Sequence, residues 1–339
     1  MRWDYKDPRR GSSFEYTNLF DSMARMPGIS ADLFPFDEIE RMHGRNVMND
    51  MLIKTVKETT PDLVFFFLYE DEFSTETVDK ITRHTKTFNW FADDHWRFEI
   101  FSRHWAPHFT LVGTTDWSAI DRYEKAGVAN VIATQWACNH HVYRPEGIEQ
   151  DLDVTFVGQV HGKRREIVAR AARAGISIQT WGAGWATGRL TQAEMIRVFS
   201  RSRINLNFSE GSAPRALLRR IRFVVTEGRH LVPPGSMRTR FNALRAREHP
   251  QIKGRTFEIP GCRALLLTEP AEGLGHYYAV GEEIATFETL DELVDLCRQY
   301  LRDSSEAERV ATAGYERTLR EHTYEHRFQE IFSQLGFSS

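Results

Sequence analysis

Apolar segments that alternate with amphipathic ones are the feature that most restricts how this chain can fold. Residues 63–69, LVFFFLY, form a continuous apolar run of the kind found in a strand covered on both faces. The segment 74–84 opens with serine and threonine followed by acidic residues, which is typical of a helix N-terminus. Strand-like and helix-like segments keep alternating along the sequence. This order predicts βαβ units and an α/β fold with parallel sheets.

The alternation comes in two series separated by a polar seam. The first series ends at a strand-like segment, 128–137, and the second begins with VTFVG at 154–158. The seam between them contains Pro145 and Gly147 and has no periodicity. We therefore place a domain boundary near residue 147, since 339 residues exceed one ordinary core. Two such sheets would leave a cleft, and ligands of open α/β sheets bind beyond the carboxyl ends of strands.

Composition excludes several classes of protein. Hydrophobic residues make up 41% of the chain and charged residues 27%, as in ordinary globular proteins. The formal net charge of −3 gives no global signal for nucleic acid or an acidic lipid surface. No apolar segment approaches the roughly 18 residues of a membrane-spanning helix, and the N-terminus does not read as a signal peptide. The three cysteines share no metal or redox spacing, so we expect a cytoplasmic protein.

A glycine-containing turn follows the first strand of the second series. In VTFVGQVHGKRRE, residues 154–166, Gly158 closes the strand, and Gly162, Lys163 and Arg164 open a helix. Glycine lets backbone approach a ligand closely, and a helix N-terminus with two cations favours an anion. The segment has neither the P-loop nor the three-glycine dinucleotide pattern. It indicates either a phosphate-binding turn or a plain strand–helix connection with solvated bases.

Acidic residues follow a strand of the first series. Asp93, Asp94 and His95 lie in NWFADDHWRFEIF, residues 89–101, among tryptophans and phenylalanines. Four interpretations stay open: an acid or base of the site, a sugar contact with aromatic stacking, ligands of a divalent metal, or Asp94 as a helix N-cap.

A cysteine and two histidines lie close together in CNHHVYRP, residues 138–145. Adjacent residues on an extended segment point to opposite sides, so joint ligation by His140 and His141 would be awkward. We interpret this segment as a surface loop and assign no metal site.

One acid is placed at the entrance to a hydrophobic unit in KGRTFEIPGCRALLLTE, residues 253–269. Lys253 and Arg255 precede Glu258, which is flanked by apolar and small residues and is expected in a short helix before a buried strand. A buried carboxylate is costly unless it is hydrogen-bonded. The hydroxyl groups of a ligand ribose could supply those bonds, with the two bases near a diphosphate. An internal Glu–Arg pair is the equally good alternative.

Taken in order, these segments resemble those of a known enzyme family. The second half looks like the catalytic half of a GT-B glycosyltransferase, and nearly the whole chain resembles the CgeB-like (spore-maturation type) family. The resemblance is carried by the ordered set of segments 1–19, 61–66, 90–96, 113–131, 143–145, 153–166, 188–210, 253–269, 281–301 and 313–328.

The resemblance implies two facing Rossmann-like domains with the nucleotide sugar bound mainly by the second. The first domain would span residues 1–147 and the second residues 148–320. Residues 321–339 would form a last helix that crosses back to the first domain.

The resemblance also suggests roles for single residues. Related retaining transferases carry two glutamates eight residues apart; Glu258 matches the second, which grips the donor ribose, whereas Pro250 stands at the first. Lys163 lies about where the relatives have a phosphate-binding lysine, and Gln159 stands where they have an arginine. GT-B enzymes need no metal at the diphosphate.

We therefore expect a glycosyltransferase that moves a sugar from a UDP- or GDP-linked donor to an unidentified acceptor. Resemblance favours retention of configuration and independence from metal, and no cofactor is expected. The residues expected to act in catalysis or line the cleft are Asp93, Asp94 and Glu15. Those expected to bind the donor are Gly158, Lys163, Arg164, Asn207, Lys253, Arg255 and Glu258. Those expected to bind the acceptor are Gly11, Ser12, His95, Arg219, Arg220 and Arg222.

Two other functions fit the same sequence. A nucleotide-sugar epimerase or hydrolase on this fold would change the donor with no acceptor present. A non-catalytic nucleotide-sugar-binding module is the second, because the first glutamate is absent at Pro250.

An arginine-rich segment, residues 210–252, interrupts the second half. Nine arginines and one acid lie between Arg215 and Arg247, although the whole chain has a net negative charge. The segment could be a solvated arm or a contact in a homo-oligomer. It could instead dock an anionic acceptor, such as a lipid-linked glycan, an acidic polymer or nucleic acid, because arginine binds phosphate through paired hydrogen bonds.

Overall fold

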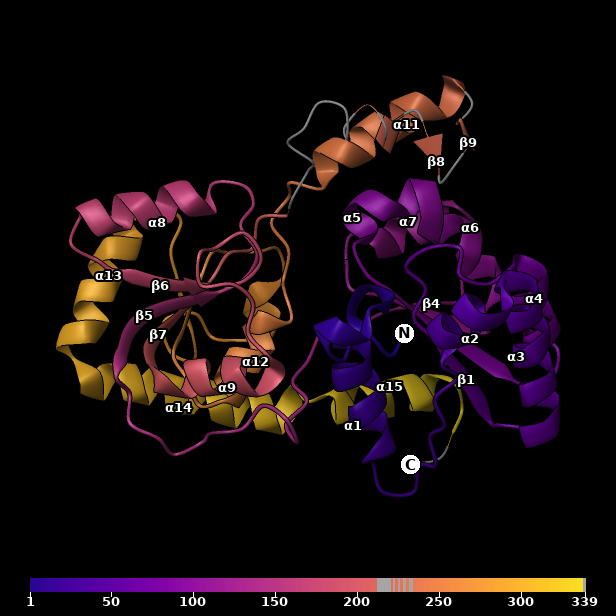
Figure 1. Cartoon of the computed structure of the whole chain (residues 1–339), viewed down its shortest axis with the longest axis horizontal. Coiled ribbons are helices and arrows are strands. Elements are labelled where there is room, and N and C mark those ends of the chain that lie inside the picture. Colours follow the sequence, from indigo (N-terminus) through magenta and orange to yellow (C-terminus); the bar gives the residue numbers. More distant parts are fainter. Residues whose placement is uncertain (212–220, 222, 225, 228–229, 232–233, 338–339) are drawn as a thin grey trace. The chain divides into compact units, whose positions relative to one another are not determined.

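Two parallel sheets organise the chain (Figure 1). Each sheet packs in its own hydrophobic core. The computed structural model describes all residues except 212–220, 222, 225, 228–229, 232–233, 338 and 339. The chain divides into two compact units. Unit 1 comprises residues 1–135, 213–247 and 327–339, and unit 2 comprises residues 136–212 and 248–326.

Unit 1 is built on a four-stranded parallel sheet in which the strands are ordered as in the sequence, β1-β2-β3-β4. The strands are β1 (Leu63–Phe66), β2 (Lys86–Phe91), β3 (Leu111–Thr114) and β4 (Val131–Ala133). Its α-helices are α1 (Asp21–Ala24), α2 (Phe36–His43), α3 (Arg45–Thr59), α4 (Thr75–Thr82), α5 (Asp94–Arg97), α6 (Arg103–Trp105), α7 (Ala119–Lys125) and α11 (Pro234–Ala246). Other helical turns are η1 (Asp4–Lys6), η2 (Pro8–Arg10), η3 (Tyr16–Phe20), η4 (Phe98–Ser102) and η5 (Ala106–His108). The short strand β8 (Thr226–Glu227) pairs antiparallel with β9 (His230–Leu231).

Alternate residues of these strands face opposite sides of the sheet, as a strand requires. Phe66 and Phe91 belong to the core that also holds side chains of α3 and α4. Phe65 faces the other way and meets Phe328 of α15 (Tyr324–Gln334) edge to face at 5.8 Å. Both faces of the sheet are therefore covered, which explains why the sequence of β1 is apolar throughout.

Unit 2 contains a five-stranded parallel sheet with the order β11-β10-β7-β5-β6. Its strands are β5 (Leu152–Val157), β6 (Ile178–Trp181), β7 (Ser202–Asn207), β10 (Leu266–Thr268) and β11 (Ala285–Thr286). Its helices are α8 (Arg164–Arg173), α9 (Gln192–Arg201), α12 (Arg255–Gly261), η6 (Leu274–His276), α13 (Leu290–Arg302) and α14 (Ser304–Glu321).

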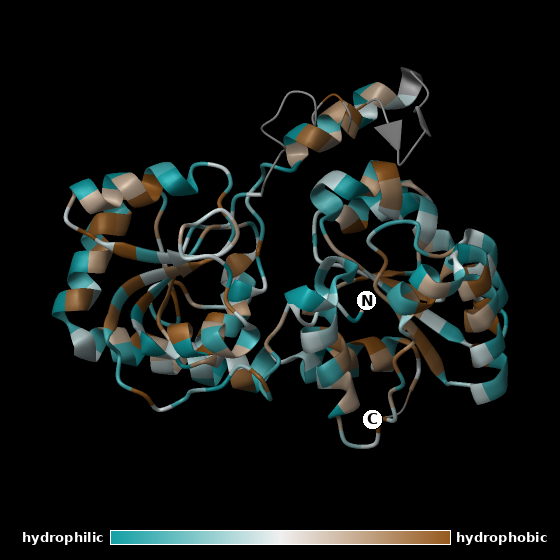
Figure 2. Cartoon of the chain, in the orientation of Figure 1, coloured by the Kyte–Doolittle hydropathy of each residue, from teal (hydrophilic) through white to brown (hydrophobic). Residues whose placement is uncertain are grey.

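The core of unit 2 lies in two clusters, one on each face of the sheet. Leu265 and Leu267 pack with side chains of α8, α13 and α14, whereas Leu266 packs with side chains of α9 and α12. Figure 2 shows hydrophobic residues on the strands of both units, whereas the helices carry both hydrophilic and hydrophobic residues. The predicted α/β class with parallel sheets is confirmed.

Helix starts follow local capping signals in the sequence. Ser74 accepts a hydrogen bond from the backbone N–H of Thr77 at the start of α4. At α9 the hydroxyl of Thr191 accepts from the backbone of Glu194, whose carboxylate in turn accepts from the backbone of Thr191. This reciprocal pair satisfies two of the backbone donors that a helix start leaves unpaired.

Candidate functional site

Polar groups gather where the strands of unit 2 end. The carboxyl ends of β5, β7 and β10 lie at one edge because the strands are parallel neighbours. The carboxylate of Glu269, directly after β10, accepts from the backbone N–H of Ser209 at 2.8 Å and of Glu210 at 3.3 Å. Burial raises the pKa of Glu269. The turns after β7 and β10 are thus tied together at the edge where an open α/β sheet binds its ligand.

The turn that begins at Gly158 is held closely by the turn after β6. The indole N–H of Trp185 donates to the carbonyl oxygen of Gly158 at 2.8 Å. Gly182 has a φ of +130°, and a Cβ at this position would lie 2.2 Å from that same carbonyl oxygen. Only glycine fits at 182, so Gly182 is needed for the close contact between the two backbone turns rather than for contact with a ligand.

Arg164 is directed towards backbone carbonyls of its own unit. Its guanidinium donates to the carbonyl oxygens of Gln159 at 2.9 Å and Phe208 at 3.1 Å. It also lies over the ring of Phe156 at 5.2 Å. The side chain is buried, and burial lowers its pKa to about 10. In the structure Arg164 therefore joins the turns after β5 and β7, and its predicted contact with the donor stays a prediction.

Lys163, in contrast, is exposed at the start of α8. Its Nζ lies 4.0 Å from the carboxylate of Glu210, a distance at the outer limit of an ion pair. Gly162 precedes it with a φ of +55°, in the left-handed region that favours glycine. Lys163 therefore presents a cation at this sheet edge that an incoming anion could recruit from Glu210.

The segment that carries Glu258 starts at the same edge. The backbone N–H of Gln251 donates to the carbonyl oxygen of Ser209 at 3.0 Å. Lys253 follows two residues later with a partly exposed side chain. Asn207, buried at the end of β7, donates from its side chain to the hydroxyl of Thr268 at 3.0 Å. Asn207 therefore links β7 to β10 in the structure.

Glu258 is completely buried in α12 and forms an ion pair with Arg255. The side chain of Arg255 is 29% exposed, and burial lowers its pKa. The internal Glu–Arg pair, one of the two alternatives derived from the sequence, is present in this structure. A role of Glu258 in binding a donor ribose stays a prediction, in which Arg255 would give way to the ligand or share the carboxylate with it.

In unit 1 the side chain of Asp94 is inaccessible to solvent. Its carboxylate accepts hydrogen bonds from the hydroxyl of Ser102 and from that of Tyr123, the latter at 2.9 Å. Burial raises the pKa of Asp94 to about 6, although these hydrogen bonds oppose the rise. Asp94 therefore holds α5, η4 and α7 together. The N-cap of α5 is Asp93 rather than Asp94, and the side chain of Asp93 makes no capping hydrogen bond.

The other residues predicted for unit 1 lie near the surface. Asp93 adopts a left-handed conformation with a φ of 64°, and its side chain and that of His95 are partly exposed. Gly11 has a φ of +84°, Ser12 pairs with Trp3 in an antiparallel bridge, and both are exposed. Glu15 is partly exposed just before η3. Their predicted roles in catalysis or acceptor binding stay predictions.

The arginine-rich segment is described only in part. Arg219, Arg220 and Arg222 lie outside the described residues. Within the described part, the guanidinium of Arg247 stacks over the ring of Trp96 at 4.3 Å, and Trp96 lies 5.9 Å from the ring of Phe223. The segment therefore packs on α5 of unit 1.

Sequence reasoning missed two acids that follow strands. Glu72 lies in the loop after β1 and accepts from the backbone N–H groups of Tyr69 at 3.2 Å and Glu70 at 2.9 Å. Burial raises its pKa to about 7, a value suited to proton transfer near neutral pH. Glu269 is the second. Their common signal, an acid shortly after an apolar strand, is visible in FFLYEDEF and LLLTE.

A hollow of about 900 Å³ lies elsewhere in unit 2 and contains none of the predicted site residues. Arg201 and Asp151, which line it, form an ion pair at 2.5 Å. Its lining is Arg144, Pro145, Glu146, Ile148, Glu149, Asp151, Arg197 and Arg201.

Comparison with protein families gives a match over half of the chain. Residues 163–333, which start at Lys163 and include the turns after β7 and β10, match the family described as glycosyl transferase-like. The chain belongs to this glycosyltransferase family. A search among curated proteins found no relative with significant sequence similarity.

Solved glycosyltransferase structures share the fold of this glycosyltransferase at low sequence identity. A glycosyltransferase from Rickettsia africae matches with a TM-score of 0.56 and 10% identity, over 92% of this chain and 85% of that one. Anabaena HepE, solved with UDP and glucose, matches with a TM-score of 0.54 and 10% identity, over 90% and 84%. These likenesses, with the two parallel sheets, confirm the predicted GT-B fold. None of the helices in the described ranges is long and apolar enough to cross a membrane.

Proposed function

We propose that this glycosyltransferase binds a nucleotide-diphosphate sugar at the carboxyl edge of the unit 2 sheet and transfers the sugar to an acceptor. The observation that supports this most is the convergence of Lys163, the Glu269-bonded turn and the segment from Gln251 at one sheet edge inside the family match. The HepE structures contain UDP, UDP-glucose, or UDP and glucose, which favours a UDP-linked donor here.

In this proposal the leaving diphosphate is stabilised by positive groups. Lys163 and the N-terminus of α8 would supply the positive potential, because a helix start carries partial positive charge from unpaired N–H groups. Lys253 would add a further positive charge near the diphosphate, and Glu258 would bind the ribose. Transfer would proceed with retention and without a metal at the diphosphate or any other cofactor. The narrower likeness to CgeB-like transferases is part of the same proposal.

The acceptor is proposed to bind unit 1. Asp93 is partly exposed and available for contact, whereas the side chain of Asp94 is inaccessible to solvent. Glu72 joins Asp93 and Glu15 as a candidate acid or base because burial raises its pKa to about 7. An epimerase or hydrolase remains the rival enzyme; it would convert the donor with no acceptor, and product analysis with donor alone separates the two.

We expect UDP to raise the melting temperature of the full chain, and to do so equally in the presence of EDTA. A ligand at 100 times its dissociation constant adds about 2.7 kcal/mol of stability. Lys163→Ala should weaken UDP binding roughly 10-fold or more, because a charged hydrogen bond is lost. Arg165→Ala is the matched control, since Arg165 is exposed in the same turn and donates to the carbonyl oxygen of Gly184 at 2.8 Å.

The outcome that contradicts the donor site is a UDP affinity unchanged in Lys163→Ala. If the rise in melting temperature caused by UDP disappears in the presence of EDTA, donor binding depends on a metal and the metal-free site is contradicted. Turnover of the donor must also depend on an acceptor; saturable donor binding without turnover on a broad acceptor panel favours the non-catalytic module.

We further propose that the acceptor is anionic and docks on the arginine-rich segment, which carries a local positive field in a chain of net negative charge. Arg238 and Arg245 of α11 are exposed. Replacing both with serine should let the protein elute from immobilised heparin at lower salt, with UDP affinity unchanged. Arg302→Ser with Arg320→Ser makes the same change in charge on exposed positions of unit 2 and should have a smaller effect. Equal elution of the two double variants would contradict this docking surface.

A further inference from the structure

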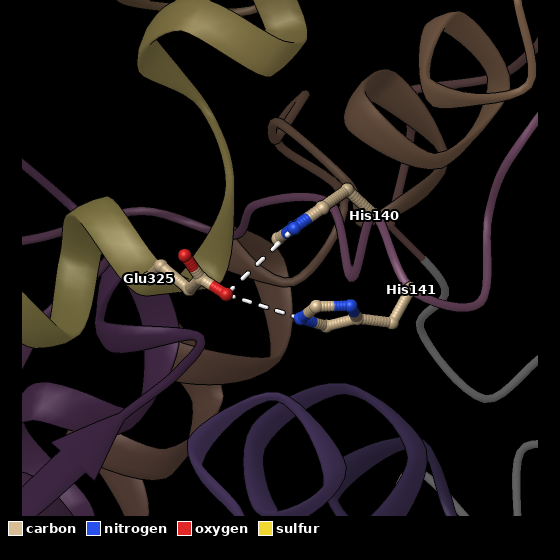
Figure 3. Close-up of side chains that lie close together, drawn as sticks. All are labelled: His140, His141 and Glu325. Atoms are coloured by element: carbon tan, nitrogen blue, oxygen red, sulfur yellow. Dashed lines mark hydrogen bonds and ion pairs between the residues drawn. The ribbon is translucent and has the colours of Figure 1, made fainter. Parts of the chain in front are cut away.

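Two histidines and a glutamate of unit 2 point their side chains at one another (Figure 3). Nε2 of His141 lies 3.0 Å from Oε1 of Glu325, and Nε2 of His140 lies 3.7 Å from the same oxygen. One nitrogen or oxygen atom from each of the three residues lies within 4.8 Å of the other two. The three side chains therefore direct lone-pair atoms into a single small volume.

A tight turn brings the two histidines to the same side. The carbonyl oxygen of buried Asn139 accepts from the N–H groups of Val142 at 3.0 Å and Tyr143 at 2.8 Å, and its side-chain oxygen accepts from the N–H of His141 at 3.1 Å. The backbone is therefore not extended here. The imidazole rings of His140 and His141 lie 4.0 Å apart, between centroids. This removes the objection that adjacent histidines point to opposite sides, which holds only for an extended segment.

The glutamate is fixed to the same turn through the backbone. The N–H of Cys138 donates to the carbonyl oxygen of His322 at 2.8 Å, and the N–H of Tyr324 donates to the carbonyl oxygen of Cys138 at 3.1 Å. Glu325 follows directly at the start of α15. Two segments far apart in the sequence are thus paired beside the three side chains, so little conformational freedom would be lost when a ligand binds.

The spacing and the ligand types suit a transition metal. Bonds of about 2.0–2.1 Å to a tetrahedral Zn²⁺ place the ligand atoms about 3.3 Å apart. The two distances from the histidines to the glutamate oxygen are 3.0 and 3.7 Å, and the three ligand atoms all lie within 4.8 Å of one another. Two imidazoles with one carboxylate are ligands that Zn²⁺ takes, and they leave a fourth position for water. Each side chain is 26–29% exposed, so an ion could reach the site.

We propose that His140, His141 and Glu325 bind one divalent transition-metal ion, with Zn²⁺ as the best fit. Residues 135–136 and 326–327 are the first and the last of the places at which the chain passes between the two units. The proposed ligands lie close to these two places in the sequence, so the ion would crosslink two of the segments that connect the units. This site is separate from the proposed diphosphate site, which needs no metal.

The test uses the full chain without an affinity tag, stripped of metal with EDTA and then freed of EDTA. We expect one Co²⁺ to bind per chain with the visible absorption of a tetrahedral ion, and Zn²⁺ to displace it and raise the melting temperature. His141→Ala and Glu325→Gln should each lower Zn²⁺ affinity at least about 100-fold, since loss of a direct ligand exceeds the 10–100-fold typical of outer-shell partners. His43→Ala, at an exposed histidine of unit 1, should leave the affinity unchanged.

Two outcomes overturn the proposal. One is absence of stoichiometric Zn²⁺ binding by the folded wild-type chain, which would leave the three residues as an ordinary hydrogen-bonded cluster. The other is Zn²⁺ affinity in Glu325→Gln equal to that of the wild type, since the amide preserves the shape and removes only the anionic ligand. Both readouts are independent of UDP binding and of transferase activity, so this proposal and the proposed function fail separately.

Discussion

Glu258→Gln is expected to lower the affinity for UDP roughly 10- to 150-fold. The loss of a hydrogen bond to a charged group costs about 1.5–3 kcal/mol, and 1.4 kcal/mol corresponds to a factor of ten. The substitution also breaks the ion pair with Arg255, so a lower stability alone would not establish a role in binding. The informative measurement compares UDP with 2′,3′-dideoxy-UDP by calorimetry.

If Glu258 grips the ribose, the wild type prefers UDP over the dideoxy analogue and Glu258→Gln loses most of that preference. Arg255→Gln is the matched control because it breaks the same ion pair and keeps the carboxylate. A preference for UDP that is the same in the wild type and in Glu258→Gln would mean that Glu258 serves only the internal pair. The comparison removes general effects on folding because both ligands are measured on each variant.

Asp94→Asn is expected to change how stability depends on pH. The pKa of Asp94 rises from 3.8 to about 6 in the folded protein, which corresponds to about 3 kcal/mol. Because the folded state keeps this proton to higher pH than the unfolded chain does, the wild type loses this stability as pH rises from about 4 to about 6. Asn at this position carries no titrating group. The free energy of unfolding of the variant, relative to wild type, should therefore increase by up to about 3 kcal/mol between pH 4 and pH 8.

Urea unfolding at several pH values measures this difference directly. Asp121→Asn removes one carboxylate from an exposed position of α7 and controls for the change in net charge. If the difference in the free energy of unfolding between Asp94→Asn and wild type is the same at pH 4 and pH 8, burial does not raise the pKa of Asp94. Transferase activity of the variant is a second readout, since the hydrogen bonds of buried Asp94 hold α5, η4 and α7 together.

Sequence patterns were sufficient for the α/β fold class, because a strand buried on both faces must be apolar along its length. They were less informative about where elements end. The apolar run from Leu63 continues to residue 69, yet β1 ends at Phe66, since the N–H of Leu68 turns to the side-chain oxygen of Asn89 at 3.0 Å. The strand β11 is limited to Ala285–Thr286, where β10 provides a partner.

The site was harder to predict because its hydrogen bonds join residues distant in sequence. Arg164 and Lys163 are adjacent, and nothing local indicates that Arg164 turns towards the carbonyl oxygen of Phe208 while Lys163 stays exposed. The assignment of residues 136–143 to unit 2 was also hard to predict, because it depends on contacts with residues distant in the sequence. The polar seam suggested a boundary at 147, whereas contacts place these residues in unit 2, where Cys138 pairs with the backbone at His322 and Tyr324.

The division of unit 1 among three separate parts of the sequence has a consequence for biosynthesis. The face of its sheet that carries Phe65 is packed against Phe328 of α15, and that helix ends at Gln334. Translation at 5–20 residues per second needs about 10–40 s to make the roughly 200 residues between the end of β4 and this helix. During that time the first four strands can form on the ribosome with one apolar face uncovered. The N-terminal half of this enzyme should therefore need a chaperone or ribosome contact until the last helix emerges, the reverse of the usual order in which the first domain is completed first.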